Sequence, residues 1–401
     1  MKEVDKRKKV RVNMKYDAVI VGAGPIGGSV AGIISKKGFN VLILEEHREI
    51  GRPVQCAGLV TPRVFDFVDA KKTVLNSVQG ADIYSPNGHR LRIDGKKTKA
   101  VVIDRTGFDK KIVMDAVDSG SEILLGSKVI DIKRKKDIKI KFLKDGIVDE
   151  VECSLLIGAD GVNSVVSKMF NFPKAKEVIS GFESEMVNID IDKKFVEIFV
   201  GKRVAPGFFS WVIPADETCM VGLCSADKPF YYFRRMFKNR VSEEVLKNAK
   251  PISYIAGSIP FGVADKTYDD NVMIAGDAAC QVKPTSGGGI FTGLVGAKHC
   301  GNTAVKALEK NDFSSKMLSA YQKLWYNEIG DELKNGMRLR KIFRKLSDSD
   351  FERIFNILDD EEILALISKH GDIDYPSRIS KILFKKPKLL KLIGPLVKAL
   401  F

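Results

Sequence analysis

One short stretch near the start of the chain, residues 16–32, constrains the fold more than any other. Residues 18–21 are continuously apolar, as expected of a strand buried on both faces of a parallel sheet. Gly22, Gly24 and Gly27 follow in the spacing G-x-G-x-x-G. The first glycine permits a tight turn, the second lets the backbone approach a pyrophosphate, and the third lets the next helix pack closely. The stretch therefore predicts a strand, turn and helix that bind a dinucleotide.

An acidic residue after the second predicted strand supports this interpretation. Residues 41–44 are apolar, and Glu45 follows them, 18 residues after Gly27. A carboxylate at this place accepts hydrogen bonds from a ribose 2′-OH and repels a 2′-phosphate. A glycine-rich turn that binds no ligand is the alternative interpretation.

Later segments repeat the arrangement of a strand followed by a turn. Residues 155–161 and 272–278 each run from an apolar strand into a turn with glycine and aspartate, Asp160 and Asp277. Asp160 can bond to backbone N–H groups or to a cofactor hydroxyl, and a well-capped connection is the alternative. The glycines at 287–289 begin a helix, whose free N–H groups we expect to face a phosphate or a negatively charged ring.

The pattern changes in the middle of the chain. Short alternating runs between residues 177 and 260 predict an antiparallel sheet that forms a substrate-side layer. One of these strands carries Phe209 and Trp211, whose rings either wall an apolar ligand pocket or belong to an ordinary core. A loop rich in Pro and Gly at 49–59 holds Cys56, which either faces a cofactor or is a small buried hydrophobe.

Charge and composition narrow the possible partners. The formal net charge of +15 favours an anionic partner, but aromatic-rich nucleic-acid signatures are missing, so no nucleic acid is expected. Much of the charge lies at the two ends. The tail, residues 381–401, is predicted either to lie on an anionic membrane surface or to pack on the protein's own core.

Targeting and metal signals are weak. No apolar run approaches the roughly 18 residues that span a bilayer, and no export signal is evident, so we expect a cytoplasmic protein that binds membranes peripherally. The histidines and cysteines show no metal-ligand spacing, so no metal site is predicted.

Together with Asp104-Arg105, these turns resemble the FAD-dependent oxidoreductases of the para-hydroxybenzoate hydroxylase fold class, over about residues 16–306. The resemblance implies an α/β fold: a Rossmann-type FAD-binding domain, an antiparallel β-sheet substrate domain and a C-terminal helical region. It implies FAD rather than NAD as cofactor. The cofactor-binding residues that it implies are Gly22, Gly24, Ile26, Gly27, Glu45, Cys56, Ala57, Gly58, Arg105, Val129, Asp277, Gly289 and Ile290.

The expected domain boundaries are discontinuous. A basic arm covers residues 1–13, and a basic helical region covers 313–401. The FAD-binding domain is expected at 14–60, 98–176 and 268–312, and the substrate domain at 61–97 and 177–267.

Finer details resemble the geranylgeranyl reductase family of archaeal lipid synthesis. They are the segments 52–56, 284–290 and 211–214 and the basic tail. The resemblance implies saturation of C=C bonds in the geranylgeranyl chains of a digeranylgeranylglycerophospholipid. Two departures are Phe209, where the family often has Tyr, and Ile213, where it often has Phe. The pattern Phe-x-Trp-x-Ile-Pro at 209–214 also leans toward flavin halogenases, which carry Trp in place of Phe209.

The expected mechanism is hydride transfer from reduced FAD to one alkene carbon and proton transfer to the other. Cys56 is the candidate catalytic residue, either as proton source or to set the ring orientation, and Phe209 and Trp211 line the substrate channel. No second dinucleotide motif is evident, so electrons are expected from ferredoxin or from NAD(P)H. The alternatives are a monooxygenase or halogenase of the same fold, or a membrane-associated flavoprotein that carries electrons.

Overall fold

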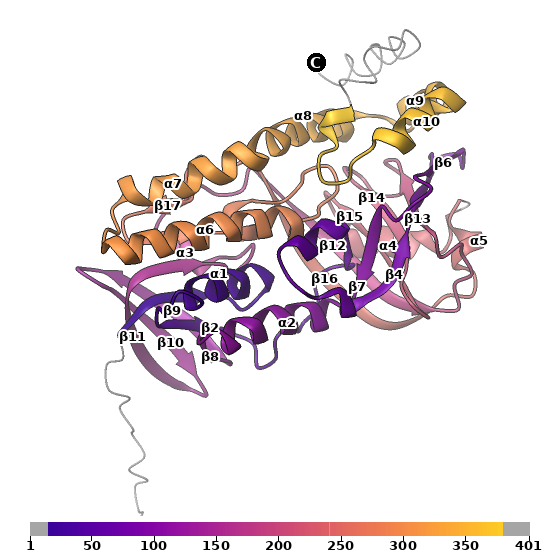
Figure 1. Cartoon of the computed structure of the whole chain (residues 1–401). Coiled ribbons are helices and arrows are strands. Elements are labelled where there is room, and N and C mark those ends of the chain that lie inside the picture. Colours follow the sequence, from indigo (N-terminus) through magenta and orange to yellow (C-terminus); the bar gives the residue numbers. More distant parts are fainter. Residues whose placement is uncertain (1–14, 240, 380–401) are drawn as a thin grey trace, which may run out of the picture.

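The computed structural model describes residues 15–239 and 241–379. The basic arm predicted at 1–13 and the amphipathic tail predicted at 381–401 lie outside these residues. Among the described helices, none combines the length and apolarity needed to cross a membrane. The chain forms a mixed α/β structure in which long helices run along one side (Figure 1).

The first sheet has eight strands and is built around β1, whose apolar run is buried as predicted. β1 pairs in parallel with β2 and β11, and β11 pairs in parallel with β18. The strands of this sheet are β1 (Lys15–Val21), β2 (Val41–Leu44), β8 (Glu122–Leu124), β9 (Ser127–Arg134), β10 (Ile138–Lys144), β11 (Ile147–Gly158), β17 (Tyr268–Asp269) and β18 (Val272–Ile274).

Three helices share one apolar core with β1 and β2: α1 (Pro25–Ser35), α2 (Arg105–Asp118) and α6 (Ile290–Lys310). The second of these begins at Arg105. This start places Arg105 and Asp109 one turn apart on the helix, where they form an ion pair.

The second sheet has seven strands in the order β16-β12-β15-β14-β13-β5-β6. The predicted alternating runs form antiparallel neighbours, but β13 pairs with β5 in parallel, because β5 comes from a distant part of the chain. The strands are β5 (Gly80–Tyr84), β6 (Arg90–Asp94), β12 (Glu177–Val187), β13 (Phe195–Val200), β14 (Phe209–Pro214), β15 (Cys219–Ser225) and β16 (Lys250–Phe261).

A small third sheet and short helices complete the middle of the chain. The third sheet has the order β3-β7-β4, with β3 (Leu59–Val60), β4 (Val74–Val78) and β7 (Ala100–Ile103). The short helices are α3 (Val165–Met169), α4 (Pro229–Met236) and α5 (Glu243–Leu246).

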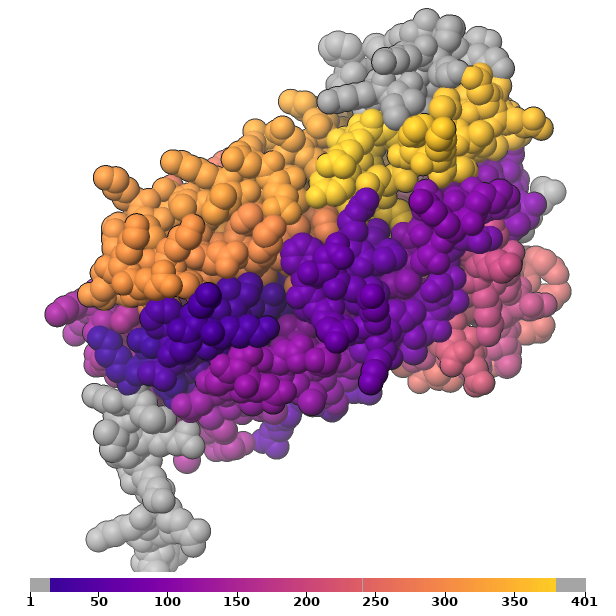
Figure 2. Space-filling view, in the orientation of Figure 1, coloured from indigo at the N-terminus to yellow at the C-terminus, as the bar shows by residue number. Residues whose placement is uncertain are grey.

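The C-terminal region is helical, as predicted, but part of it belongs to the interior. α7 (Ser315–Trp325) and α8 (Asp331–Lys345) are joined by one π-helical turn, and α9 (Asp348–Leu358) and α10 (Glu361–His370) follow. Arg340 of α8 is buried and pairs with Glu177 of β12 at 2.6 Å. Figure 2 shows the yellow C-terminal residues lying against the purple N-terminal half of the chain.

Candidate active site

A cavity of about 1160 Å³ brings the two large sheets and the C-terminal region together. This volume exceeds the range of about 300–1,000 Å³ typical of small-ligand pockets. Its walls include the ends of β1 and β2, the inner face of the second sheet, and residues 367–379. The cavity is therefore large enough to hold a dinucleotide together with part of a second ligand.

The first glycine turn forms a close-fitting corner of this cavity. Gly22 has a φ of +101°, and a Cβ there would overlap the Ala159 carbonyl oxygen. A Cβ at Gly27 would overlap the Gly22 carbonyl oxygen, whereas one at Gly24 would meet nothing within 4 Å. Gly24 lines the cavity directly before α1, so a phosphate can approach the positive end of that helix.

Glu45 lies at the end of β2 beside this corner. One of its carboxylate oxygens accepts a 2.7 Å hydrogen bond from the Ala23 N–H, and the other accepts a 2.9 Å bond from the His47 N–H. These bonds hold the side chain against the cavity wall. A carboxylate fixed here fits a ribose hydroxyl donor.

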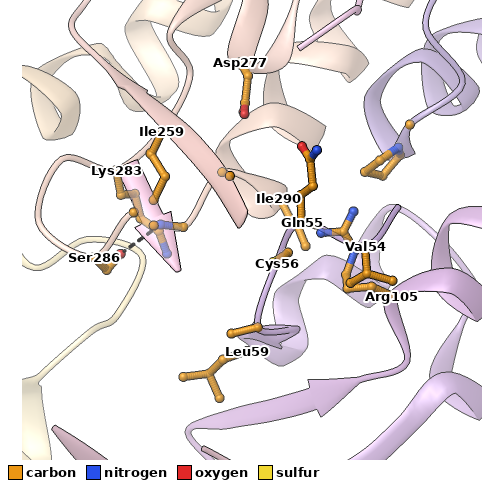
Figure 3. A pocket seen from close by; sticks show the side chains of 18 of the residues that line it. Val54, Gln55, Cys56, Leu59, Arg105, Ile259, Asp277, Lys283, Ser286 and Ile290 are labelled. Atoms are coloured by element: carbon orange, nitrogen blue, oxygen red, sulfur yellow. Dashed lines mark hydrogen bonds between the residues drawn. The ribbon is translucent and has the colours of Figure 1, made fainter. Parts of the chain in front are cut away.

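The middle of the cavity carries opposite charges. Arg105 pairs with Asp109 at 2.9 Å. Burial disfavours the charge of Arg105, but Asp109 and Cys56 outweigh this effect and raise its pKa. Burial also raises the pKa of Asp277 to about 6, although Arg105 opposes the rise. Figure 3 shows Arg105, Cys56 and Asp277 around one space.

Two further predicted segments, the turn at 155–161 and the glycines at 287–289, behave differently from each other. Asp160 accepts hydrogen bonds from the Ser164 hydroxyl at 2.6 Å and from the Val165 N–H at 2.6 Å, so it caps a connection, as the alternative interpretation held. At residues 287–289 the prediction of free N–H groups was wrong for Gly287, which donates to the Lys283 carbonyl at 2.9 Å. This bond closes the loop that leads into α6.

Most predicted site residues meet in this cavity. Its walls include Gly22, Gly24, Ile26, Glu45, Cys56, Ala57, Arg105, Val129, Phe209, Trp211, Asp277, Gly289 and Ile290. Gly27 and Gly58 are not among its lining residues and serve packing instead, because a Cβ at either would collide with a carbonyl oxygen. The fit of the glycine corner and the carboxylates to a dinucleotide is good.

Two groups in the cavity wall were not predicted from the sequence. Lys283 donates to Asp374 at 2.7 Å, and both side chains are almost fully buried. Asp374 also accepts a hydrogen bond from Thr61. The second group is Glu183, whose carboxylate accepts a 2.7 Å bond from the Trp211 indole. No motif marks these residues, because each acts through partners far away in the sequence.

Comparison with known proteins agrees with this geometry. Residues 15–323 match the family model described as FAD binding domain. The chain is 36% identical to an uncharacterized protein of Methanocaldococcus jannaschii, over 91% of this chain and 94% of the relative. It is 33% identical to the digeranylgeranylglycerophospholipid reductase of the same organism, over 95% and 98%.

A solved structure supports the fold. A geranylgeranyl bacteriochlorophyll reductase-like protein from Thermoplasma acidophilum superposes with a TM-score of 0.83 at 23% identity, covering 96% of this chain and 100% of that chain. The predicted fold class and the FAD cofactor are thereby confirmed. The chain belongs to the geranylgeranyl reductase family of FAD-dependent oxidoreductases, which act on C=C bonds.

Proposed function

We propose that this protein saturates the C=C bonds of geranylgeranyl chains in a digeranylgeranylglycerophospholipid. The observation that carries the proposal is a single cavity with a dinucleotide corner on one side and an apolar sheet face on the other. The 33% sequence identity to a reductase of that lipid, which extends over 95% of this chain, supports the substrate class. Slightly higher identity to an uncharacterized protein of the same organism leaves the exact lipid as part of the proposal.

The cofactor end is assigned as follows. Glu45 would accept hydrogen bonds from the adenosine ribose, and Arg105 and the backbone near Val129 would flank the adenosine half. Ile26 would lie by the pyrophosphate, Asp277 by the ribityl–pyrophosphate region, and Gly289 and Ile290 by the flavin ring; all of these residues line the cavity. When bound and reduced, FAD supplies the hydride that no side chain can donate.

The second sheet provides the substrate end. Phe209, Trp211, Ile255 and Ile259 point their apolar surfaces at the cavity. An unactivated alkene offers little charge to stabilise, so alignment of the chain and exclusion of water must contribute much of the rate. Lys99 also lines the cavity and donates to the Ser368 carbonyl at 3.0 Å, which makes it our candidate to hold the lipid phosphate.

Cys56 lies on the loop between these two ends and is half-buried. We keep it as the residue that faces the flavin ring. Replacing Cys56 by Ala should slow flavin reoxidation by lipid about tenfold by loosening the ring position. An unchanged rate in stopped-flow absorbance would remove Cys56 from the mechanism.

An exposed surface supports contact with a membrane. Phe230 and Tyr231 of α4 and Tyr254 of β16 are 52%, 51% and 62% exposed. The rings of Phe230 and Tyr254 pack on Phe182, which also lines the cavity. Arg235 of α4 lies over the Tyr231 ring, so aromatic and basic groups share this surface, as interfacial helices require.

This membrane proposal has a direct test. Substituting Phe230, Tyr231 and Tyr254 together by Ser should reduce co-sedimentation with anionic phosphatidylglycerol vesicles. Met114→Ser is the matched control, because Met114 is 58% exposed on α2. Equal binding by both variants and the parent would exclude this surface.

An anaerobic experiment distinguishes the proposed reaction from its alternatives. The FAD-bound protein is photoreduced anaerobically and mixed with unsaturated or with fully saturated archaeal phospholipid. The proposal is supported if the flavin is reoxidised by the unsaturated lipid but not by the saturated lipid, and if mass spectrometry shows hydrogen added to the lipid product. Reoxidation that requires oxygen would favour a monooxygenase or halogenase. The electron donor, ferredoxin or NAD(P)H, can be identified by which one reduces the bound flavin.

A further inference from the structure

The inner face of the second sheet carries one buried carboxyl group that opens on the cavity. Glu183 of β12 is 4% exposed and lines the cavity. Its Oε2 atom accepts a 2.7 Å hydrogen bond from the Trp211 indole N–H. No cation of the described residues forms an ion pair with it. A carboxyl group placed among apolar residues without a cation has a large desolvation cost, so its presence calls for a function.

Glycines lie beside this carboxyl group on the same and neighbouring strands. In the strand register Gly222 lies opposite Glu183, and Gly181 lies opposite Gly257 on the next strand. A Cβ at Gly222 would come within 2.8 Å of the Trp211 ring, so this glycine allows the indole to lie flat beside Glu183. Gly181 and Gly257 line the cavity together with Glu183, and this low part of the sheet wall, called the recess below, lets cavity space border the carboxyl group.

The recess lies next to the loop that carries Cys56. A Cβ at Gly257 would be 3.7 Å from the Gln55 Cβ atom, so the loop packs against the edge of the recess. Gln55 and Cys56 line the same cavity, and Figure 3 shows them with Ile290 in its centre. The carboxyl group and the residues of the proposed flavin site therefore line the same cavity.

The surroundings favour the protonated form of this carboxyl group. Burial raises the pKa of Glu183 to about 7, the Trp211 bond opposes the rise, and Glu185 adds to it. The other titratable neighbour is Cys224, whose pKa burial raises to about 12, so it stays a neutral thiol. At neutral pH a large share of the molecules thus holds a proton at Glu183.

We propose that Glu183 is the catalytic acid that delivers the proton to the alkene. This role rests on the proposed function. The π bond breaks and two C–H bonds form: one carbon receives the hydride from the reduced cofactor, which is oxidised, and the other receives the proton from the Glu183 O–H bond. Glu183 remains as a carboxylate and regains its proton from solvent, past half-exposed Glu185 on the same strand. Cys56 then orients the ring.

The test compares two buried carboxyl groups of the same sheet. Glu183→Gln keeps the shape but has no acidic proton, so the single-turnover rate of alkene reduction should fall by about 100-fold or more. Glu197→Gln is the matched control: burial also raises the pKa of Glu197 to about 7, but this residue of β13 does not line the cavity. Both variants should bind FAD and be photoreduced as the parent is.

The pH profile gives a second criterion. In the parent the rate should fall as the pH rises through about 7, because the proton is then lost. Glu183→Gln should abolish this limb, whereas Glu197→Gln should keep it. An active parent with an equally active Glu183→Gln variant overturns the inference and leaves the proposed function intact. A parent that reduces no alkene overturns both.

A spectroscopic measurement does not depend on turnover. The chain has two tryptophans, and the indole of Trp325 bonds to Thr267 instead. In the FAD-bound protein labelled with ¹⁵N-tryptophan, the Trp211 indole signal should shift with a midpoint near 7. Glu183→Gln should remove this titration and Glu197→Gln should not. A Trp211 signal that does not titrate in the parent would contradict the assigned proton.

Discussion

The two walls of the cavity are built in different ways. The cofactor wall consists of backbone corners, in which Gly22, Gly27 and Ala159 approach so closely that a side chain would collide. The sheet wall consists of single side chains on separate strands, such as Trp211 on β14 and Glu183 on β12. The first wall therefore depends on residues without a side chain, such as Gly22 and Gly27, whereas the second depends on which side chains point into the cavity.

This difference predicts different failures. A change in the cofactor wall should disturb the backbone, and with it both FAD binding and folding. A change in the sheet wall should leave FAD bound and affect only what happens to the second ligand. Gly27→Val and Trp211→Ala test whether the two walls separate in this way, and a third substitution tests the C-terminal segment that closes the cavity.

The largest effect is expected for Gly27→Val. The new side chain would overlap the Gly22 carbonyl oxygen, and backbone atoms cannot yield as a flexible side chain can. The purified variant should be colourless and should unfold at lower temperature, as absorbance and calorimetry would show. Gly24→Ala is the matched control, because its Cβ meets no protein atom within 4 Å. It should fold normally, with weaker FAD binding. A yellow, stable Gly27→Val variant would contradict the close-packed corner.

A smaller effect is expected where the C-terminal segment closes the cavity. Asp374→Ala leaves the Lys283 ammonium buried without its partner, which should cost about 3–5 kcal/mol of unfolding free energy. Glu244→Ala, which removes an exposed partner of Lys247, should cost at most about 1 kcal/mol. Urea unfolding of the two variants measures the difference. Equal losses would mean that the buried pair of Lys283 and Asp374 does not stabilise the segment that closes the cavity.

The smallest effect on the protein itself is expected for Trp211→Ala. The indole is half-buried on the sheet wall, so FAD content should not change. Flavin reoxidation by unsaturated lipid should slow by about tenfold or more, because the alkene is held less well. A loss of FAD in this variant would show that the walls are not independent.

The contrast between the walls also explains what could be predicted from the sequence. The corners at Gly22 and Asp277 are contiguous motifs, so their chemistry is visible in a few neighbouring letters. Glu183 and Lys283 carry no such signal, because their roles depend on hydrogen bonds to Trp211 and Asp374, which lie far from them in the sequence. The pairing of β13 with β5 was missed for the same reason. The boundaries proposed for the domains remain a prediction.

The central claim is that one cavity joins bound FAD to an alkene on the sheet wall. The measurement that tests it most directly is the anaerobic stoichiometry of a single turnover with digeranylgeranylglycerophospholipid. One double bond should be saturated for each reduced flavin that is reoxidised. Reoxidation without any loss of double bonds, or flavin that stays reduced in the presence of the lipid, would contradict the account.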